Sequence, residues 1–177
     1  MLTELLAAPA SLTSPARMSA FVPSRPRNFG QRRRTFAIVA SQYNAEFVTG
    51  LVDHARRELE AIASVFHITV HEVPGAFEIP VVVQEIAARE TADAIIALGV
   101  IIEGATAHAA LIGQAVTEAL MRTALQYRVP VIHEVLLVKN EEQARARCLG
   151  EEINRGTEAA RTAARMTQIM ADLRAER

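Results

Sequence analysis

One histidine stands out as a candidate proton-transfer group because it follows a run of small residues. His108 ends the segment Gly104-Ala105-Thr106-Ala107-His108, which leads into a helical pattern. Free backbone N–H groups and the positive end of a helix dipole form a site for an anion such as phosphate. An imidazole beside that anion could transfer protons near neutral pH. Thr106 could cap the helix or donate its hydroxyl, and on this segment alone a capping threonine and a surface histidine remain the simpler interpretation.

Three other short segments carry groups that could bind a small molecule. Tyr43 could stack on a flat heterocycle. Gly75 permits a tight turn, after which Glu78 could accept hydrogen bonds from hydroxyl groups. Arg147 could hold a phosphate. Each side chain also has a structural interpretation, as an aromatic packing residue, a first-turn carboxylate favoured by a helix dipole or a solvated arginine.

The predicted fold explains why these segments belong together. Apolar runs of strand length cover residues 35–41, 67–73, 94–102 and 129–138, and helical patterns cover residues 47–62, 79–88, 111–124, 141–149 and 157–173. The alternation of strands and helices predicts an α/β three-layer sandwich, a flavodoxin-like four-stranded parallel sheet with helices on both faces. Such sheets bind ligands beyond the carboxyl ends of their strands, where strand order reverses. Because every segment follows a predicted strand, we expect the four segments to meet at one edge of the sheet.

The composition excludes several classes of protein. The formal net charge is −1, so we expect no whole-chain attraction to nucleic acid or to an anionic membrane. No apolar run is long enough to span a membrane. Cys148 is the single cysteine, which favours a reducing compartment such as the cytoplasm, and with no histidine nearby in sequence we expect an inert thiol. His67 and His71 have the spacing of strand neighbours and no cysteine pair joins them, so we predict no metal site.

Residues 1–34 differ from the rest of the chain. They hold six arginines, four prolines and a single acidic residue, Glu4, without a sustained apolar period. This pattern predicts a disordered N-terminal extension, followed by one α/β domain over residues 35–177. An arginine-rich, acid-poor segment is also typical of an organellar transit peptide, and Met18 could begin a shorter chain. We favour a disordered extension or a misassigned start over a targeting segment.

Four motifs together resemble one enzyme family. They are Val-Pro-Gly-Ala-Phe-Glu-Ile-Pro at residues 73–80, Gly-Ala-Thr-Ala-His at 104–108, Val-Pro-Val-Ile at 129–132 and Glu-Gln-Ala-Arg-Ala-Arg at 142–147, followed by Asn-Arg-Gly at 154–156. The chain is similar to the lumazine synthases from about Thr35 to its C-terminus. The first two motifs at this separation are highly specific.

The resemblance implies a reaction and a set of site residues. Lumazine synthases condense 5-amino-6-ribitylaminouracil with 3,4-dihydroxy-2-butanone 4-phosphate, without a cofactor, to form the riboflavin precursor 6,7-dimethyl-8-ribityllumazine. By position, His108 is the implied catalytic residue, and Arg147 reaches the phosphate from a neighbouring subunit. The implied substrate-binding residues are Tyr43, Asn44, Gly75, Ala76, Phe77, Glu78, Val100, Ile101, Ile102, Gly104, Ala105, Thr106, His133, Arg147 and Arg155. The implied assembly is a homo-oligomer, a pentamer that could extend to a decamer or a sixty-subunit shell.

Several positions depart from the family pattern. Glu103 and Glu151 stand where basic residues are frequent, and His133 stands where an aromatic residue is frequent. Ala109 and Ala110 replace a common aromatic-acid pair. These differences leave a second hypothesis open, a catalytically weak paralogue that binds flavin or lumazine. A purely structural shell protein and a receiver-like module rank lower, the latter because residues 41–44 carry no acidic cluster.

Overall fold

The computed structural model describes residues 23–26, 33–62, 65–151 and 154–176. Most of the predicted N-terminal extension therefore lies outside the described residues. The helices and strands are β1 (Arg34–Ser41), α1 (Ala45–Ala61), β2 (Val65–Val73), η1 (Ala76–Glu78), α2 (Ile79–Ala88), β3 (Ala94–Ile102), α3 (His108–Tyr127), β4 (Val131–Val138), α4 (Glu141–Cys148) and α5 (Arg155–Ala175).

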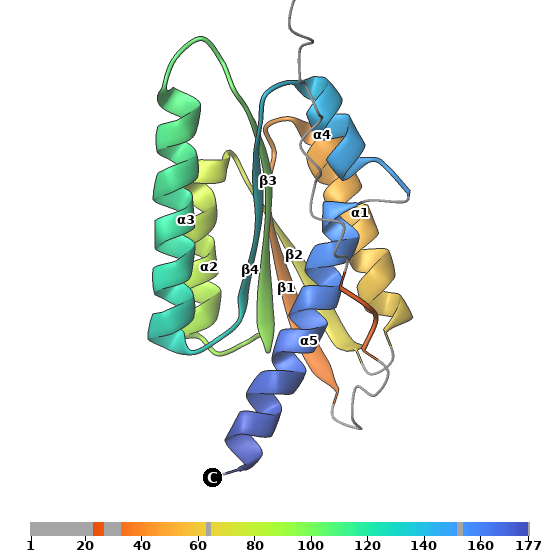
Figure 1. Ribbon diagram of the computed structural model, residues 1–177. Coiled ribbons are helices and arrows are strands. Elements are labelled where there is room, and N and C mark those ends of the chain that lie inside the picture. The colour runs from red at the N-terminus through yellow and green to blue at the C-terminus, as the bar shows by residue number, and fades with distance from the viewer. Residues whose placement is uncertain (1–22, 27–32, 63–64, 152–153, 177) are drawn as a thin grey trace, which may run out of the picture.

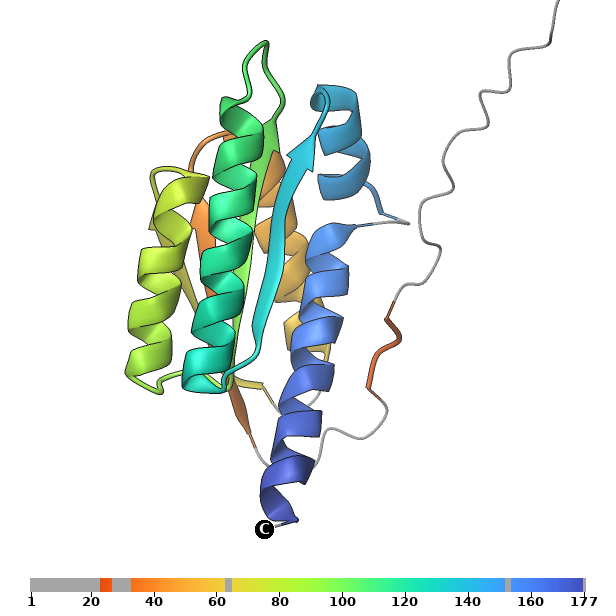
Figure 2. The same ribbon diagram turned by 60° about the vertical axis from the view of Figure 1, so that its left-hand side comes forward.

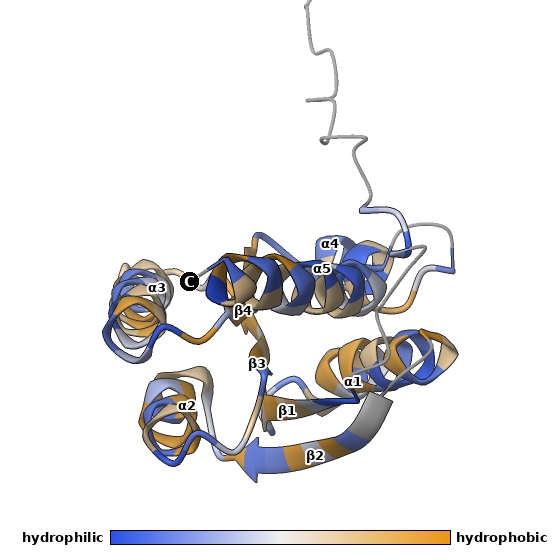
Figure 3. Cartoon of the chain, turned by 90° about the horizontal axis from the view of Figure 1, so that it is seen from below, coloured by the Kyte–Doolittle hydropathy of each residue, from blue (hydrophilic) through white to orange (hydrophobic). Residues whose placement is uncertain are grey.

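The four strands form one parallel sheet in the order β2-β1-β3-β4. Helices α2 and α3 cover one face, and α1, α4 and α5 cover the other (Figure 1). The view along the strands shows the three layers side by side (Figure 3). The predicted fold class is confirmed. From β1 the chain builds first toward β2 and then toward β3 and β4, so the point where strand order reverses lies between β1 and β3.

The central strand β3 shows how the sequence specifies this arrangement. Its residues from Ala94 to Val100 are all buried, as an apolar run without alternation requires when helices cover both faces of a sheet. Ile96 and Leu98 pack in a cluster with α1 and α5, while Ile95 belongs to the cluster formed with α2 and α3. The sheet therefore separates two apolar cores.

Element boundaries differ from the predicted ones by a few residues, and two differences have clear causes. Strand β4 begins at Val131 rather than residue 129, after Pro130, which has no N–H and whose carbonyl instead accepts a hydrogen bond from the Ile95 N–H. Helix α5 begins at Arg155 rather than residue 157 because the buried Asn154 side chain caps it, accepting from the Gly156 N–H at 2.9 Å.

A short part of the N-terminal region packs on the domain. Residues 23–26 run beside α5 (Figure 2). Arg25 donates two hydrogen bonds to the Glu58 carboxylate on α1, at 2.7 and 2.8 Å. Arg161 on α5 donates to the same carboxylate at 2.7 Å and to the Pro23 carbonyl at 3.2 Å. Glu58 is buried, so its charge is stabilised by two guanidinium groups, one of which comes from the N-terminal segment.

This ion cluster predicts acid-sensitive stability. The Arg25 hydrogen bonds, followed by those of Arg161, lower the pKa of Glu58 against the opposing effect of burial. Because the folded pKa lies below the unfolded value of 4.5, Glu58 stabilises the fold above that value and loses this contribution as the pH falls through the folded pKa. We expect Glu58→Gln to lower the free energy of unfolding at about pH 7 and to flatten its decline below about pH 4.5, measured by denaturant unfolding across that range.

The matched control for that experiment is Glu60→Gln. Glu60 is an exposed carboxylate near the end of the same helix, 3.8 Å from Arg56. An exposed pair of this kind contributes little to stability, so the control should follow the wild-type pH dependence. If both variants have the same pH dependence, the Glu58 cluster does not stabilise the fold.

Candidate active site

A cleft opens at the carboxyl ends of β1 and β3, where strand order reverses. It has a volume of about 720 Å³. Its lining comes from the β1–α1 connection, the turn after β2, the end of β3 and the first two turns of α3. The lining residues are Tyr43, Asn44, Gly75, Ala76, Phe77, Glu78, Val100, Ile101, Ile102, His108, Leu111, Ile112 and Ala115.

Asn44 ties the two strand ends together at the cleft. Its backbone is left-handed, with φ of 57°, a conformation that asparagine tolerates better than most residues. Its side-chain Nδ2 donates to the Val100 carbonyl at 2.8 Å, which bridges the end of β1 to the end of β3. This arrangement leaves the neighbouring Tyr43 72% exposed at the cleft, where its ring can meet a ligand.

Gly75 lies close to two side chains of the cleft and has an ordinary backbone conformation. The chain bends at Gly75 as expected, but its φ of −136° is an extended conformation that any residue adopts, so the bend does not itself require glycine. A Cβ at this position would lie 2.8 Å from Glu78 Oε2 and 3.2 Å from the Tyr43 ring. The absence of a side chain at Gly75 leaves room for the Glu78 carboxylate and the Tyr43 ring.

The floor of the cleft is apolar. Val100, Ile101 and Ile102 end β3, and α3 contributes Leu111, Ile112 and Ala115. The sequence pattern predicts these three α3 residues only as part of a helix over residues 111–124. They stand three, four and seven positions after His108, the spacing that places residues on one helical face. Leu111 is 64% exposed, which a core residue would not be.

His108 is the first residue of α3, and it lies exposed at the cleft. The predicted cap is wrong: Ala107 occupies the N-cap position, and no side chain caps the helix. Gly104, Ala105 and Thr106 are exposed in the loop before it, close to the cleft in sequence but not part of its lining. A Cβ on Gly104 would meet nothing within 4 Å, so the loop is open to solvent on that side.

Three predicted site residues lie away from this cleft within one chain. His133 lies opposite Ala97, partway along β4 and β3, rather than at the carboxyl ends of these strands. Arg147 lies on α4 and Arg155 begins α5, so both belong to the layer on the opposite face of the sheet from α2 and α3 (Figure 1). A single chain therefore assembles the part of the predicted site around Tyr43, Glu78 and His108, without these three residues.

Two side chains near α4 and α5, one of them fully buried, have shifted pKa values. Burial raises the pKa of Glu134 to about 7, with Arg155 opposing the shift and Glu158 adding to it. Burial also raises the pKa of the Cys148 thiol to about 11. A buried thiol of this kind stays protonated at neutral pH and is a poor nucleophile, in line with the expected inert cysteine.

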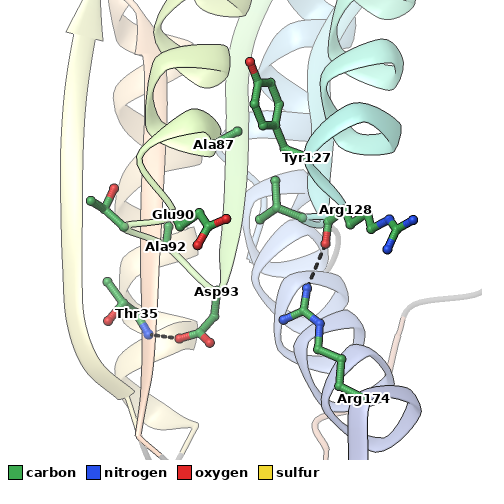
Figure 4. A pocket seen from close by; sticks show the side chains of 10 residues that line it. Thr35, Ala87, Glu90, Ala92, Asp93, Tyr127, Arg128 and Arg174 are labelled. Carbon is green, nitrogen blue, oxygen red and sulfur yellow. Dashed lines mark hydrogen bonds between the residues drawn. The ribbon is translucent and has the colours of Figure 1, made fainter. Parts of the chain in front are cut away.

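A second cavity, of about 420 Å³, lies at the opposite end of the sheet (Figure 4). Asp93 lines it and accepts a hydrogen bond from the Thr35 N–H at 2.8 Å. Arg174 on α5 donates to the Arg128 carbonyl at 2.9 Å, just after α3 ends. The first bond joins the amino ends of β1 and β3, and the second joins the carboxyl ends of α5 and α3, so we assign this cavity a structural role.

The described residues contain neither a candidate metal site nor a helix that could span a membrane. Within residues 23–26, 33–62, 65–151 and 154–176, no group of three or more His, Cys, Asp and Glu side chains could hold a metal ion. None of the helices in the same part of the chain is both long and apolar enough to cross a bilayer.

Comparison with known proteins matches the sequence of this chain to one family. The family model of 6,7-dimethyl-8-ribityllumazine synthase matches residues 33–171, which include every residue that lines the cleft. The chain belongs to the lumazine synthase family. A 6,7-dimethyl-8-ribityllumazine synthase from Stenotrophomonas maltophilia (strain R551-3) is 40% identical over 140 residues, which are 78% of this chain and 90% of that protein.

Other lumazine synthases are similar to the same extent. The enzyme of that name from Kineococcus radiotolerans is 43% identical over 70% of this chain and 76% of its own length. The one from Leptothrix cholodnii is 38% identical over 77% of this chain and 87% of its own length. Among solved structures, a de novo designed Rossmann fold protein is similar with a TM-score of 0.32 and 21% identity over 64% of this chain and 90% of that chain.

Family membership establishes the class of reaction. The chain is a transferase of riboflavin biosynthesis with lumazine synthase activity. The predicted family and enzyme class are confirmed, and the receiver-like alternative is excluded. Which residues bind and convert the substrates is a separate question, because the family match covers cleft and non-cleft residues alike.

Proposed function

We propose that the cleft between β1 and β3 binds both substrates and that His108 transfers protons between them. The observation that carries this proposal is that His108 lines the same cleft as Tyr43, Glu78 and a set of apolar side chains. The substrates supply the amine, the ketone and the leaving group, so the protein has no bond-forming group of its own to provide. Its contribution is to hold two reactants together, for which effective molarities reach about 10⁵ M or more.

The pyrimidine substrate fits the apolar half of the cleft. Tyr43 and Phe77 are exposed aromatic side chains that can stack on its flat ring. Ile101 and Ile102 supply a dry surface beneath it. The Glu78 carboxylate accepts hydrogen bonds from the ribityl hydroxyl groups, while Gly75 keeps the space above that carboxylate free.

The sugar phosphate fits the loop before α3. Backbone N–H groups of Gly104, Ala105 and Thr106 at the start of a 20-residue helix hold the phosphate, with the Thr106 hydroxyl as a further donor. His108 then lies beside the carbon skeleton. It moves protons as the 5-amino group of the pyrimidine attacks the ketone and water leaves, as phosphate is eliminated, and as the ribityl-bearing nitrogen closes the second ring with loss of water.

A homo-oligomer completes this site. Arg147, Arg155 and His133 lie outside the cleft of their own chain, and the cleft residues themselves include no arginine or lysine for the phosphate or the pyrimidine carbonyls. A neighbouring copy supplies these groups across the interface, Arg147 to the phosphate and Arg155 to the pyrimidine. A head-to-tail interface repeats until the ring closes, and the resemblance to the lumazine synthases implies that five copies close it. Larger assemblies of such rings remain compatible with the chain.

Mixing two inactive variants tests the shared site. His108→Ala and Arg147→Ala should each have low activity, because each removes one half of every site. When the two variants are dissociated, mixed in equal amounts and reassembled, about a quarter of the interfaces combine an intact His108 with an intact Arg147. We expect lumazine formation, followed by absorbance, to recover to about a quarter of the wild-type rate.

The control is each variant dissociated and reassembled alone, which should regain nothing. Activity that stays low in the mixture, with reassembly shown by sedimentation, would place His108 and Arg147 in the same chain's site or remove Arg147 from the site. Full activity of the Arg147→Ala variant on its own would contradict the phosphate-binding role.

The cell compartment is also a proposal. We propose that the enzyme is cytoplasmic, and the supporting observation is that Cys148 is a buried cysteine with a free thiol. Tagged protein located by fractionation tests this assignment.

A further inference from the structure

His133 and Thr117 form a hydrogen-bonded pair between β4 and α3. The His133 Nε2 lies 2.7 Å from the Thr117 hydroxyl oxygen. The other ring nitrogen, Nδ1, accepts a hydrogen bond from the Val135 N–H at 3.2 Å. The Thr117 hydroxyl is also 2.7 Å from the Gly113 carbonyl oxygen, one turn earlier in α3. Both nitrogens of the imidazole therefore have a partner.

These contacts determine where the protons lie. Nδ1 must present its lone pair, because the Val135 N–H is a donor. A neutral imidazole carries one proton, so that proton is on Nε2, which donates to the Thr117 oxygen. The Thr117 hydroxyl proton is then free for the Gly113 carbonyl, which can only accept. Every proton in the chain of hydrogen bonds has one position.

The surroundings favour the neutral ring. Burial lowers the pKa of His133 and outweighs a backbone hydrogen bond at His133 that raises it, and no charged side chain contributes. On α3, Glu118 is occupied by a hydrogen bond from Gln114 at 2.9 Å. A second proton would go to Nδ1 and would break the hydrogen bond from Val135. His133 thus differs from the exposed His108, which has no such pair of partners among the described residues.

The pair is accessible from outside the chain. Strand β4 is at the edge of the sheet, Thr117 is exposed and His133 is half-buried. The edge position of β4 and the exposure of Thr117 let another chain approach the ring.

We propose that Thr117 is a positioning residue that holds His133 as the neutral Nε2–H tautomer, so that His133 presents a fixed flat ring to the pyrimidine substrate in the cleft of the neighbouring subunit. The proposal rests on the shared site proposed above. It assigns the two histidines different roles: His108 transfers protons and His133 packs. Nothing in the sequence distinguishes Thr117 from other exposed helical threonines, because its role appears only through its contact with β4.

The tautomer can be observed directly. In ¹⁵N-labelled enzyme at about pH 7, the long-range ¹⁵N–¹H spectrum separates protonated from unprotonated ring nitrogens. The His133 signals are assigned by their loss in His133→Gln. We expect a protonated Nε2 and an unprotonated Nδ1 in the wild type, and a mixture of tautomers in Thr117→Val. A wild-type signal from the Nδ1–H tautomer or from the doubly protonated ring would overturn the proposal without bearing on the shared site.

Kinetics of the same variants test the role of the ring. Thr117→Val keeps the shape of the side chain and removes the hydroxyl, so we expect the KM for the pyrimidine to rise about fivefold, the effect of one neutral hydrogen bond, with kcat within about twofold. Thr117→Ser keeps the hydroxyl and should restore both the tautomer and the KM. The matched control is Thr162→Val on α5, where the same hydroxyl-to-carbonyl bond, 2.8 Å to Glu158, involves no histidine.

The outcomes separate this inference from the proposed function. An unchanged KM in Thr117→Val, in enzyme whose tautomers have become mixed, would show that the fixed ring does not serve the substrate. An equal rise of KM in Thr117→Val and Thr162→Val would indicate a general effect of losing a helical hydroxyl and would also overturn it. Failure of the shared site would appear separately, as no recovery in the mixing of His108→Ala with Arg147→Ala.

Discussion

Replacing His108 with alanine should lower kcat about 10²-fold while leaving the fold and the assembly intact, because general acid–base groups contribute about 10²–10⁴-fold. His108 is exposed at the first turn of α3 and supports no core contact, so its removal costs little stability. The residual rate should still exceed the uncatalysed rate, since the cleft continues to hold the two reactants together. Single-turnover lumazine formation, followed by absorbance with both substrates saturating, measures the effect on the chemical steps.

The control is His71→Ala, the same substitution at an exposed histidine of the edge strand β2. It should leave kcat unchanged, since His71 is not part of the cleft lining. A rate in His108→Ala within a few-fold of the wild type would remove His108 from the proton-transfer steps. In that case the cleft would still bind substrate, and the loss of Glu78 or Tyr43 would be expected to raise KM alone.

The parts of the fold that local patterns determine were predictable from the sequence. The uninterrupted apolar run of β3 indicated a strand buried on both faces, and residues 79–88 gave a helical pattern whose bounds match α2. Because a parallel sheet binds ligands beyond its strand ends, the sequence alone predicts that Tyr43, Glu78 and His108 lie together. The cleft contains all three.

The features that depend on tertiary contacts could not be predicted. The Tyr43 ring lies 3.2 Å from where a Cβ on Gly75 would be, and no local pattern reports such an approach. Arg25 and Glu58 are 33 positions apart, and the arginine- and proline-rich composition of residues 1–34 does not predict their contact. Leu111 belongs to the apolar face of a predicted helix, and the pattern does not report that part of that face lines a cleft. In each case the partner is distant in sequence.

The close crossing of α1 and α5 is a further contact of this kind, and it leads to the largest stability effect we expect. Gly156 lies in the first turn of α5, against the backbone of α1 at Leu51. A Cβ on Gly156 would overlap the Leu51 carbonyl oxygen and lie 2.9 Å from its carbonyl carbon. Backbone cannot rotate away as a side chain can, so the two helices would have to separate. Buried alanines of α5, including Ala159 and Ala160, pack in the core next to this crossing and would lose contacts.

Gly156→Ala should therefore lower the free energy of unfolding by about 3 kcal/mol, the upper end for overpacking, and the apparent melting temperature by about 6–12 °C at matched protein concentration. The control is Gly113→Ala in α3, where the nearest atom to a new Cβ is 3.8 Å away. That helical position has room, so alanine should stabilise by about 0.5–1 kcal/mol. Opposite signs for the same substitution would show that the helix crossing, rather than helix propensity, requires glycine at 156. A stabilised or unchanged Gly156→Ala protein would mean that α1 and α5 lie farther apart than this structure has them.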